Sequence, residues 1–319
     1  NLASIDPERR KDASARAELL NAADVVILCL PDEAAKEAVA MIENDTTRVI
    51  DASTAYRVDP AWTYGFAEMS GDQRAAIAGS KRVSNPGCYP TGFIGLVKPL
   101  VQAGIIPADW PVTVNAVSGY SGGGKAMIAA FEGGQGDPFR AYGLTQKHKH
   151  VPEMQLHTGL SGRPMFAPAV GAYAQGMLVE VPFQLGALPG RPSVADVHAA
   201  LRAAYAGERF VSVATLEQSQ AMTGLEPQAL NGTNQMRLFV FGDPSGDQAL
   251  LVAQLDNLGK GASGAAGQNP NPLPGLGEGA GGLPGGPTAT ASACAQTGQA
   301  ERLRGASSRL PASSQTAHT

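Results

Sequence analysis

Short apolar runs and amphipathic stretches alternate in the first part of the chain. Residues 24–30, Asp-Val-Val-Ile-Leu-Cys-Leu, form a continuous apolar run, typical of a strand buried on both faces of a parallel sheet. The stretch 33–42 places four apolar side chains on one side, which predicts a helix, and 48–52 predicts the next strand. This order predicts a parallel, right-handed crossover unit.

Strands outnumber helices in the rest of the chain. Apolar patterning predicts strands at 112–117, 163–169, 177–184, 210–214, 235–242 and 249–255. We expect helices at 126–131 and 194–205, and we interpret 132–149 as a long irregular loop. The pattern therefore predicts an α/β protein, with a Rossmann-type dinucleotide-binding domain followed by an α+β domain that has a mixed sheet.

The most informative stretch is 83–92, because it places one thiol between a strand and a helix. A strand is expected at 80–84, a Pro-Gly turn follows, and the spacing of apolar residues predicts a helix over 91–103. Cys88 is thus expected at a helix N-terminus, where backbone N–H groups and the helix dipole stabilise a thiolate or an oxyanion. A small buried thiol is the alternative, but the flanking prolines favour a nucleophile.

The glycine-rich segment 118–125 admits three interpretations. A phosphate-binding loop would need Ser or Thr where Ala126 stands. A serine-hydrolase elbow would have His198 available, but no clear acidic partner precedes it. We favour a loop whose glycines let a cofactor or substrate approach the backbone beside Cys88.

Two imidazoles and a carboxylate occur close together, as His148, His150 and Glu153. His150, Glu153 and His157 would share one side of a helix, but the spacing lacks the usual metal-binding pair, and the flanking lysines repel a cation. A solvated basic loop is a further alternative. A thiol enzyme needs a histidine for proton transfer and a carboxylate to orient it, so we expect that role and no metal.

Charge and cysteine content narrow the partners. The net charge of −4 offers no basic stripe for nucleic acid or an anionic membrane, which leaves small molecules as partners. No apolar run approaches the roughly 20 residues of a membrane span. Three widely spaced cysteines do not form a disulfide framework, so we expect a cytoplasmic protein.

The beginning of the chain resembles the ribose-reading part of a dinucleotide fold. Residues 2–10 can be interpreted as a strand end followed by a turn with Asp6, Arg9 and Arg10. An acidic residue there favours a free 2′-hydroxyl and an arginine accommodates a 2′-phosphate, so the position alone leaves the choice open. A solvated helix start is an equal alternative. No glycine-rich fingerprint precedes this turn, and we expect the sequence to begin about one strand-and-helix unit late.

Four motifs together resemble the N-acetyl-γ-glutamyl-phosphate reductases of the shorter bacterial type, a family of arginine biosynthesis. They lie at 85–91, 118–122, 148–153 and 256–262. The resemblance implies a partial dinucleotide-binding domain at 1–86, completed by 257–274, and a catalytic and dimerisation domain at 87–256. It implies a homo-oligomer, a dimer or a tetramer. The Gly/Pro/Ala/Ser-rich tail 275–319 is predicted to be disordered.

The resemblance also implies a reaction. Cys88 would attack the acyl phosphate of N-acetyl-glutamyl 5-phosphate to form a thioester, which NADPH would reduce to the semialdehyde. His148 or His150, with His150 preferred, would be acid and base, with Glu153 orienting it. Arg57 and Asn85 are expected to bind the substrate. The cofactor-binding residues are expected to be Pro31, Ser53, Ser121, Gly122, Asn271, Arg9 and Arg10.

The chain departs from the family at both ends. The glycine loop that would seat the cofactor pyrophosphate is missing, and prolines at 270, 272 and 274 replace apolar residues around Asn271. We therefore expect reduced or no activity for these 319 residues. The alternative function is an inactive fragment that acts only as a dimerising module.

Overall fold

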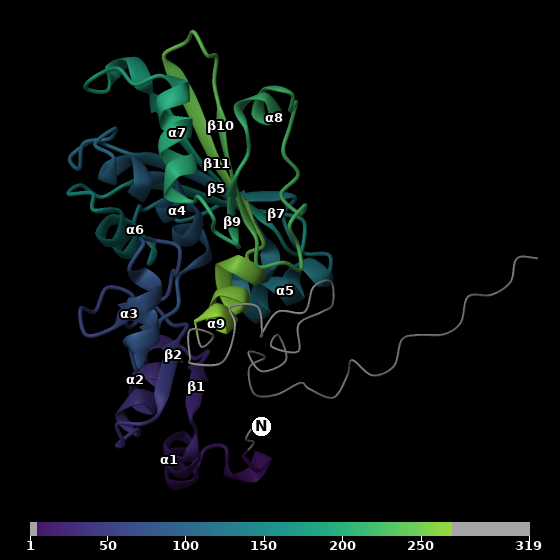
Figure 1. Cartoon of the computed structure of the whole chain (residues 1–319). Coiled ribbons are helices and arrows are strands. Elements are labelled where there is room, and N and C mark those ends of the chain that lie inside the picture. The colour runs from purple at the N-terminus through teal and green to yellow at the C-terminus, as the bar shows by residue number, and fades with distance from the viewer. Residues whose placement is uncertain (1–4, 270–319) are drawn as a thin grey trace, which may run out of the picture.

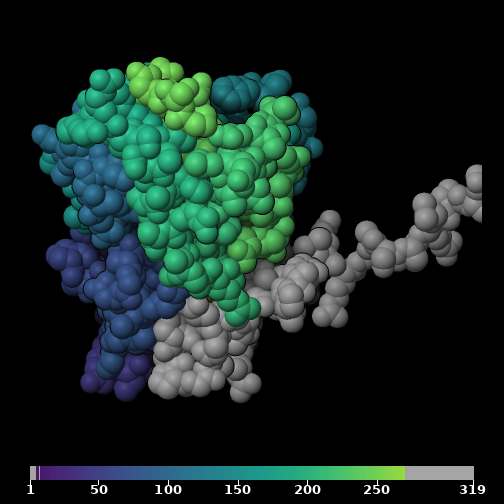
Figure 2. All heavy atoms as spheres, turned by 45° about the horizontal axis from the view of Figure 1, so that its top comes forward, coloured from purple at the N-terminus to yellow at the C-terminus, as the bar shows by residue number. Residues whose placement is uncertain are grey.

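The computed structural model describes residues 5–269, which fold around two sheets. Figure 1 shows the four-stranded sheet with its helices at the bottom, in purple and blue, and the seven-stranded sheet above it, in teal and green. The space-filling view in Figure 2 shows the same two units stacked on each other. This arrangement matches the α/β organisation expected from the sequence.

All strands of the first sheet are parallel, in the order β1-β2-β4-β3. The strands are β1 (Val25–Leu28), β2 (Arg48–Asp51), β3 (Thr63–Tyr64) and β4 (Arg82–Ser84). The helical elements around them are η1 (Pro7–Arg9), α1 (Ala13–Ala22), α2 (Asp32–Ala40) and α3 (Gln73–Gly79). Leu28 pairs with Asp51, and Asp51 pairs with Ser84, so the carboxyl ends of three strands meet at one edge. The predicted parallel crossover is confirmed.

The second sheet is mixed, with the order β6-β7-β5-β8-β11-β10-β9. Its strands are β5 (Thr113–Gly119), β6 (Phe139–Ala141), β7 (Met165–Gly171), β8 (Met177–Gln184), β9 (Val211–Val213), β10 (Met236–Phe241) and β11 (Gln248–Leu255). The interpretation of 132–149 as wholly irregular was wrong, because β6 pairs antiparallel with β7. All three residues of β6 are exposed, so no burial pattern marked this edge strand in the sequence.

One face of the second sheet is covered by α4 (Cys88–Gln102), whose apolar side packs against β8 and β11. Further helical elements are η2 (Tyr120–Gly123), α5 (Gly124–Glu132), α6 (Val151–Thr158), η3 (Leu185–Ala187), α7 (Val194–Ala204) and α8 (Leu216–Gln220). Helix α4 begins at Cys88, three residues earlier than the sequence predicted. Pro90 lies in its first turn, where proline is tolerated because the N–H groups have no acceptor inside the helix.

The chain returns to the first sheet at its end. A π-helical turn, η4 (Gly259–Ser263), leads into α9 (Gly264–Gln268), and Ala266 packs with Ile50 and Val83 of the first sheet. Asn271 and the predicted disordered tail lie outside the described residues. Within 5–269, no helix is long and apolar enough to cross a membrane.

Candidate active site

Cys88 is the first residue of α4 and follows the carboxyl edge of the first sheet after a short link. The N-cap is Gly87, whose backbone is extended, so the link turns directly into the helix. On its other side the backbone of Gly261 packs against Cys88, because a Cβ built on Gly261 would lie 2.7 Å from the Cys88 Cβ. Cys88 therefore lies between the two units and under the final segment of the described chain.

Three functional groups meet over Gly87. A Cβ built on this glycine would lie 2.7 Å from Arg57 Nη1, 2.7 Å from His150 Nε2 and 2.9 Å from Glu153 Oε1. The three side chains come from the loop after β2 and from the start of α6, and they converge on the residue before the thiol. The residue must be glycine, since any side chain would displace all three.

The start of α6 fixes His150 and Glu153 relative to each other. His150 is the N-cap, Pro152 lies in the first turn, and the helix ends at Gly159, which has a φ of +82°. A spacing of three residues puts two side chains on one helix face. The structure thus brings together the imidazole and carboxylate that the sequence singled out.

Glu153 is a fully buried acceptor. It accepts hydrogen bonds from Tyr64 Oη at 2.7 Å, from Arg57 Nη1 at 2.9 Å and from the Gly87 N–H at 3.2 Å. Burial raises the pKa of Glu153, and the Arg57 charge acts against that rise. Within the described chain no hydrogen bond joins Glu153 to His148 or His150, so this carboxylate holds the Gly87 backbone and Arg57 and not an imidazole. Sequence reasoning missed Tyr64, which lies in a two-residue strand without a motif.

Arg57 and Asn85 are engaged by protein groups. Arg57 Nε donates to the Asn85 carbonyl, Nη1 to Glu153 and Nη2 to the Ala52 carbonyl, each at 2.9 Å. Asn85 Nδ2 donates to the Ala262 carbonyl at 3.0 Å. Both residues therefore lie beside Cys88, but these polar atoms form hydrogen bonds within the protein.

The two histidines have different surroundings. His148 Nδ1 accepts a hydrogen bond from the His150 backbone N–H at 3.2 Å, and its ring packs among Tyr89, Tyr142 and Phe166. His150 is buried, and its Nδ1 has no hydrogen-bond partner. Burial lowers the pKa of His148 to about 4, and burial with the Arg57 charge lowers the pKa of His150 well below 6.5. Both imidazoles are neutral at pH 7.

The thiol is also neutral in this structure. Cys88 as a whole stays partly exposed, but loss of solvation raises the pKa of its thiol to about 11, outweighing Arg57 and the Tyr89 N–H. The expectation that the helix N-terminus makes a thiolate was therefore wrong, because desolvation is the larger effect. No hydrogen bond joins the Cys88 thiol to either histidine among the described residues.

The expected cofactor residues of the first sheet lie at its carboxyl edge. Pro31 is the exposed N-cap of α2, and Ser53 Oγ donates to Asp51 Oδ2 at 2.6 Å. Asp51 Oδ1 and Ser84 Oγ are buried there without hydrogen-bond partners. A sheet of this kind binds its ligand beyond the carboxyl ends of the strands, so this edge fits the polar groups of a dinucleotide.

The glycine loop forms η2 beside this site. Asn257 Nδ2 donates to Ser121 Oγ at 2.9 Å, while Gly122 is exposed. His198 contacts the Ala214 carbonyl from α7 at 2.9 Å, so the hydrolase alternative loses its histidine. The loop thus presents backbone to solvent, as a ligand-approach loop requires.

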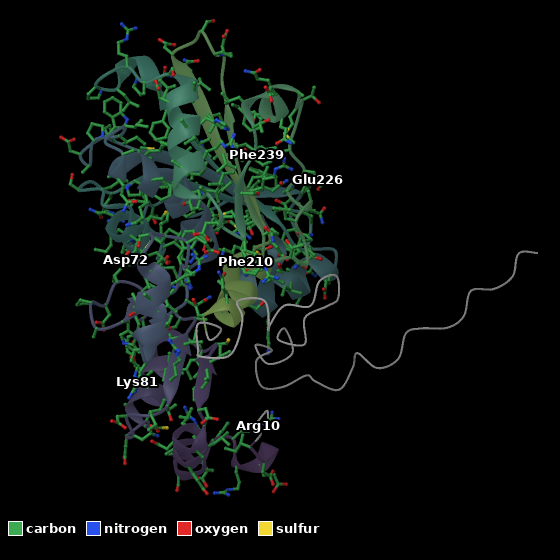
Figure 3. All side chains as sticks on the ribbon, in the orientation of Figure 1. Arg10, Asp72, Lys81, Phe210, Glu226 and Phe239 are labelled. Atoms are coloured by element: carbon green, nitrogen blue, oxygen red, sulfur yellow. The ribbon has the colours of Figure 1, made fainter. Side chains whose placement is uncertain are left out.

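Arg9 and Arg10 lie elsewhere. Arg9 is exposed and pairs with Asp12 at 3.5 Å. Figure 3 labels Arg10 at the lower end of the first unit, and Figure 1 shows α4 in the unit above. The expected contact of Arg9 and Arg10 is with the ribose of the cofactor and not with Cys88, so this role stays a prediction.

The chain is similar to known proteins over most of its length. Residues 5–77 match the semialdehyde dehydrogenase, NAD binding domain, and residues 88–257 match the semialdehyde dehydrogenase, dimerisation domain. The N-acetyl-gamma-glutamyl-phosphate reductase of Burkholderia lata is 56% identical over 271 residues, which cover 84% of this chain and 86% of that protein. The N-acetyl-gamma-glutamyl-phosphate reductase 2 of Nostoc sp. is 51% identical over 288 residues, which cover 87% of this chain and 89% of that protein.

A solved structure shares the fold. Aspartate semialdehyde dehydrogenase II from Vibrio cholerae, complexed with ASA, has a TM-score of 0.61 at 16% identity. The match covers 81% of this chain and 80% of that one. The two-sheet architecture is therefore that of the semialdehyde dehydrogenase fold.

Proposed function

Because the chain belongs to the N-acetyl-gamma-glutamyl-phosphate reductase family, we propose that it reduces N-acetyl-glutamyl 5-phosphate to N-acetyl-glutamate 5-semialdehyde and releases phosphate. It is an NADP-dependent oxidoreductase of arginine biosynthesis. The observation that carries this function is the convergence of His150, Glu153 and Arg57 over Gly87, directly before the only free thiol in the described chain.

In the first step the Cys88 sulfur attacks the acyl carbon, the carbon–oxygen bond to phosphate breaks, and a thioester forms. The thiol is neutral before attack, so its proton must leave as the carbon–sulfur bond forms. The neutral His150 takes that proton and passes it to the departing phosphate. The backbone N–H groups of the first turn of α4 stabilise the oxyanion.

The carboxyl ends of β1, β2 and β4, together with Pro31, Ser53, Ser121 and Gly122, would hold the cofactor. Bound there, NADPH would supply the hydride that the thioester carbon needs. The resulting adduct on Cys88 then expels the sulfur as a thiolate and releases the aldehyde. His150 returns a proton from solvent to the thiolate, which regenerates the starting thiol.

Arg57 and Glu153 affect the reaction of Cys88 through the charge of the guanidinium and through the position of the Gly87 backbone. The Arg57 charge favours the ionised sulfur, against the larger effect of desolvation. Glu153 holds the Gly87 N–H and the guanidinium at the same time. The pair therefore keeps a positive charge beside the reacting sulfur.

The second unit holds the protein in a homo-oligomer, a dimer or a tetramer, in the cytoplasm. The outer face of β5, β7 and β8 has a cavity of about 420 Å³, lined in part by Tyr142 and Glu180. Around it Phe139 and Leu144 are 63% and 77% exposed. Large apolar side chains exposed beside a cavity are typical of a subunit interface, and residues 88–257 match a dimerisation domain.

The reverse reaction tests the function directly. Protein is mixed with NADP, phosphate and the semialdehyde, and NADPH formation is followed by absorbance, with Cys88→Ser as the matched variant. We expect a measurable rate for the wild type and none for Cys88→Ser. An equal rate in both would exclude the thioester route. Binding of NADPH without turnover would support the dimerising module. In the forward direction, with N-acetyl-glutamyl 5-phosphate and NADPH, phosphate release without NADPH consumption would indicate an acyl hydrolase.

A further inference from the structure

Lys260 is a buried cation in the π-helical turn, with 1% of its surface exposed. Its Nζ donates to both carboxylate oxygens of Glu68 and to Gln268 Oε1, each at 2.8 Å. Gln268 Nε2 in turn donates to Glu68 Oε1 at 2.8 Å. All three hydrogens of the ammonium thus have acceptors, and the network ties the final segment to the loop after β3.

Two aromatic rings enclose the same ammonium. Lys260 Nζ lies 5.6 Å from the ring centroid of Phe66 and 5.7 Å from that of Phe210. Figure 3 labels Phe210 beside the ribbon of the final segment. Burial alone would raise the pKa of Glu68, but the Lys260 charge and the hydrogen bonds outweigh it and lower this pKa. The pair is therefore ionic, and its geometry is fixed from several sides.

The residue after Lys260 packs against the Cα and Cβ of Cys88. A Cβ built on Gly261 would lie 2.7 Å from the Cβ and 3.2 Å from the Cα of Cys88. The turn is fixed on two further sides, since the Gly261 N–H donates to the Asp256 carbonyl at 2.9 Å and Asn85 donates to the Ala262 carbonyl. Single π-helical turns occur frequently at functional sites.

We propose that Lys260 is a positioning residue for Cys88: its ion pair with Glu68 holds the π-helical turn against the nucleophile, which fixes the direction of the sulfur and limits the access of water to it. As a role in catalysis, this proposal rests on the function proposed above. The positioning of Cys88 by Lys260 does not depend on that function, because it is measured through the reactivity of the Cys88 thiol. Neither Lys260 nor Glu68 touches the substrate in this scheme.

The test removes the ion pair without leaving a buried charge. Lys260→Met leaves Glu68 uncompensated and can unfold the protein, so the main variant is Lys260→Met with Glu68→Gln, in which both side chains are neutral. Lys260→Arg keeps the charge. Each variant is first checked for folding by circular dichroism and by its NADPH affinity.

We expect two opposite effects in the folded double variant. The kcat falls about tenfold or more, because a displaced nucleophile loses near-attack geometry, while KM changes little. Iodoacetamide alkylates Cys88 faster at pH 7, and the midpoint of its pH profile moves from about 11 toward the ordinary 9.0 as water reaches the thiol. The titratable and charged groups that act on this thiol, Arg57, Glu153, Tyr89 and Tyr142, are unchanged in the variant.

Arg74→Met is the matched control. Arg74 also joins the two units by an ion pair, from α3 to Glu208, with 2.9 Å between Nη1 and Oε1. This variant should keep the wild-type alkylation profile and kcat. A folded double variant with wild-type alkylation and kcat would overturn the proposal. Altered alkylation in a chain whose wild type reduces nothing would support the positioning while refuting the proposed function.

Discussion

The ring of Tyr64 stacks on the imidazole of His157, with centroids 3.6 Å apart and planes 21° apart, while the Tyr64 hydroxyl donates to Glu153. His157 Nε2 in turn contacts the Arg57 carbonyl at 2.7 Å. The stacked rings of Tyr64 and His157 thus contact both members of the Arg57–Glu153 ion pair. The site around Gly87 therefore has two layers. The rings of Tyr64 and His157 form the outer layer, which sets the positions of the Arg57 and Glu153 charges in the inner layer.

Tyr64→Phe should weaken this support without disturbing the stack. The variant leaves Glu153 Oε2 with only the Gly87 N–H as donor, so we expect a loss of about 1.5–3 kcal/mol in the free energy of unfolding. The kcat should fall severalfold because Glu153 and Arg57 shift. Urea unfolding and steady-state kinetics measure the two effects.

Tyr205→Phe is the control for that variant. Tyr205 donates to the Gly95 carbonyl at 2.8 Å, a buried hydrogen bond to a neutral acceptor. It should cost about 1 kcal/mol of stability and leave kcat unchanged. If Tyr64→Phe behaved in the same way, the outer layer would have no effect on the chemistry.

Gly87→Ala should abolish activity in a folded protein. The added methyl would meet Arg57 Nη1 and His150 Nε2 at 2.7 Å, too close for a Cβ contact, so both groups must leave the positions that they hold beside Cys88. The measurement is the initial rate of NADPH formation at saturating substrates. Gly79→Ala has nothing within 4 Å of its new Cβ and should keep the full rate. Equal rates in the two variants would contradict the assignment of the site.

Alkylation of Cys88 should be slow at neutral pH in the ligand-free protein. The pKa of the thiol is about 11, so the reactive thiolate is scarce at pH 7 and increases as the pH rises toward 11. Iodoacetamide labelling across this range, read by mass spectrometry of the peptide that contains Cys88, gives the midpoint. A midpoint below 8 would mean that the helix N-terminus prevails over desolvation after all.

Stability should decrease as the pH falls from about 6.5 to about 4. The ordinary histidine pKa is 6.5, whereas burial lowers the pKa values of His148 and His157 to about 4 in the folded protein. In this window the unfolded chain binds protons that the folded chain excludes, so each histidine removes at most about 1.4 kcal/mol per pH unit. Partial exposure of both imidazoles reduces that amount.

Urea unfolding at pH 7.5 and pH 5 measures this dependence. His157→Gln removes one of the lowered groups, so its stability should change less between the two pH values than that of the wild type. A steeper change in the variant would be inconsistent with a neutral, buried His157. Because the variant also alters the contact with Tyr64, the comparison uses the slope with pH and not the absolute stability.

Local sequence patterns predicted the secondary-structure elements that are determined by residues close together in the sequence. The apolar run before Pro31 and the amphipathic stretch after it were sufficient for the β1-α2-β2 crossover, because period and burial are local signals. The NPGC segment identified the strand-to-helix junction for the same reason. The edge strand β6 was missed because its residues are all exposed.

Long-range contacts could not be predicted in this way. Tyr64 acts on a carboxylate 89 positions away, and Lys260 on one 192 positions away, so no local pattern predicts either contact, although Lys260 lies within the motif at 256–262. The charge state of Cys88 was also predicted wrongly, since a helix dipole is visible in sequence but desolvation depends on everything that packs around the sulfur. The sequence thus singled out Cys88 as the proposed nucleophile, while the reactivity of this thiol depends on the tertiary structure.

The cover that Gly261 provides for Cys88 also has a consequence for biosynthesis. A ribosome completes the helix that bears the thiol long before it adds the turn that shields it. A nascent chain of this protein therefore carries Cys88 without this cover until η4 and α9 dock, and oxidants in the cell reach the thiol more readily during that interval. Slow translation of the codons for residues 259–268 would prolong the exposure.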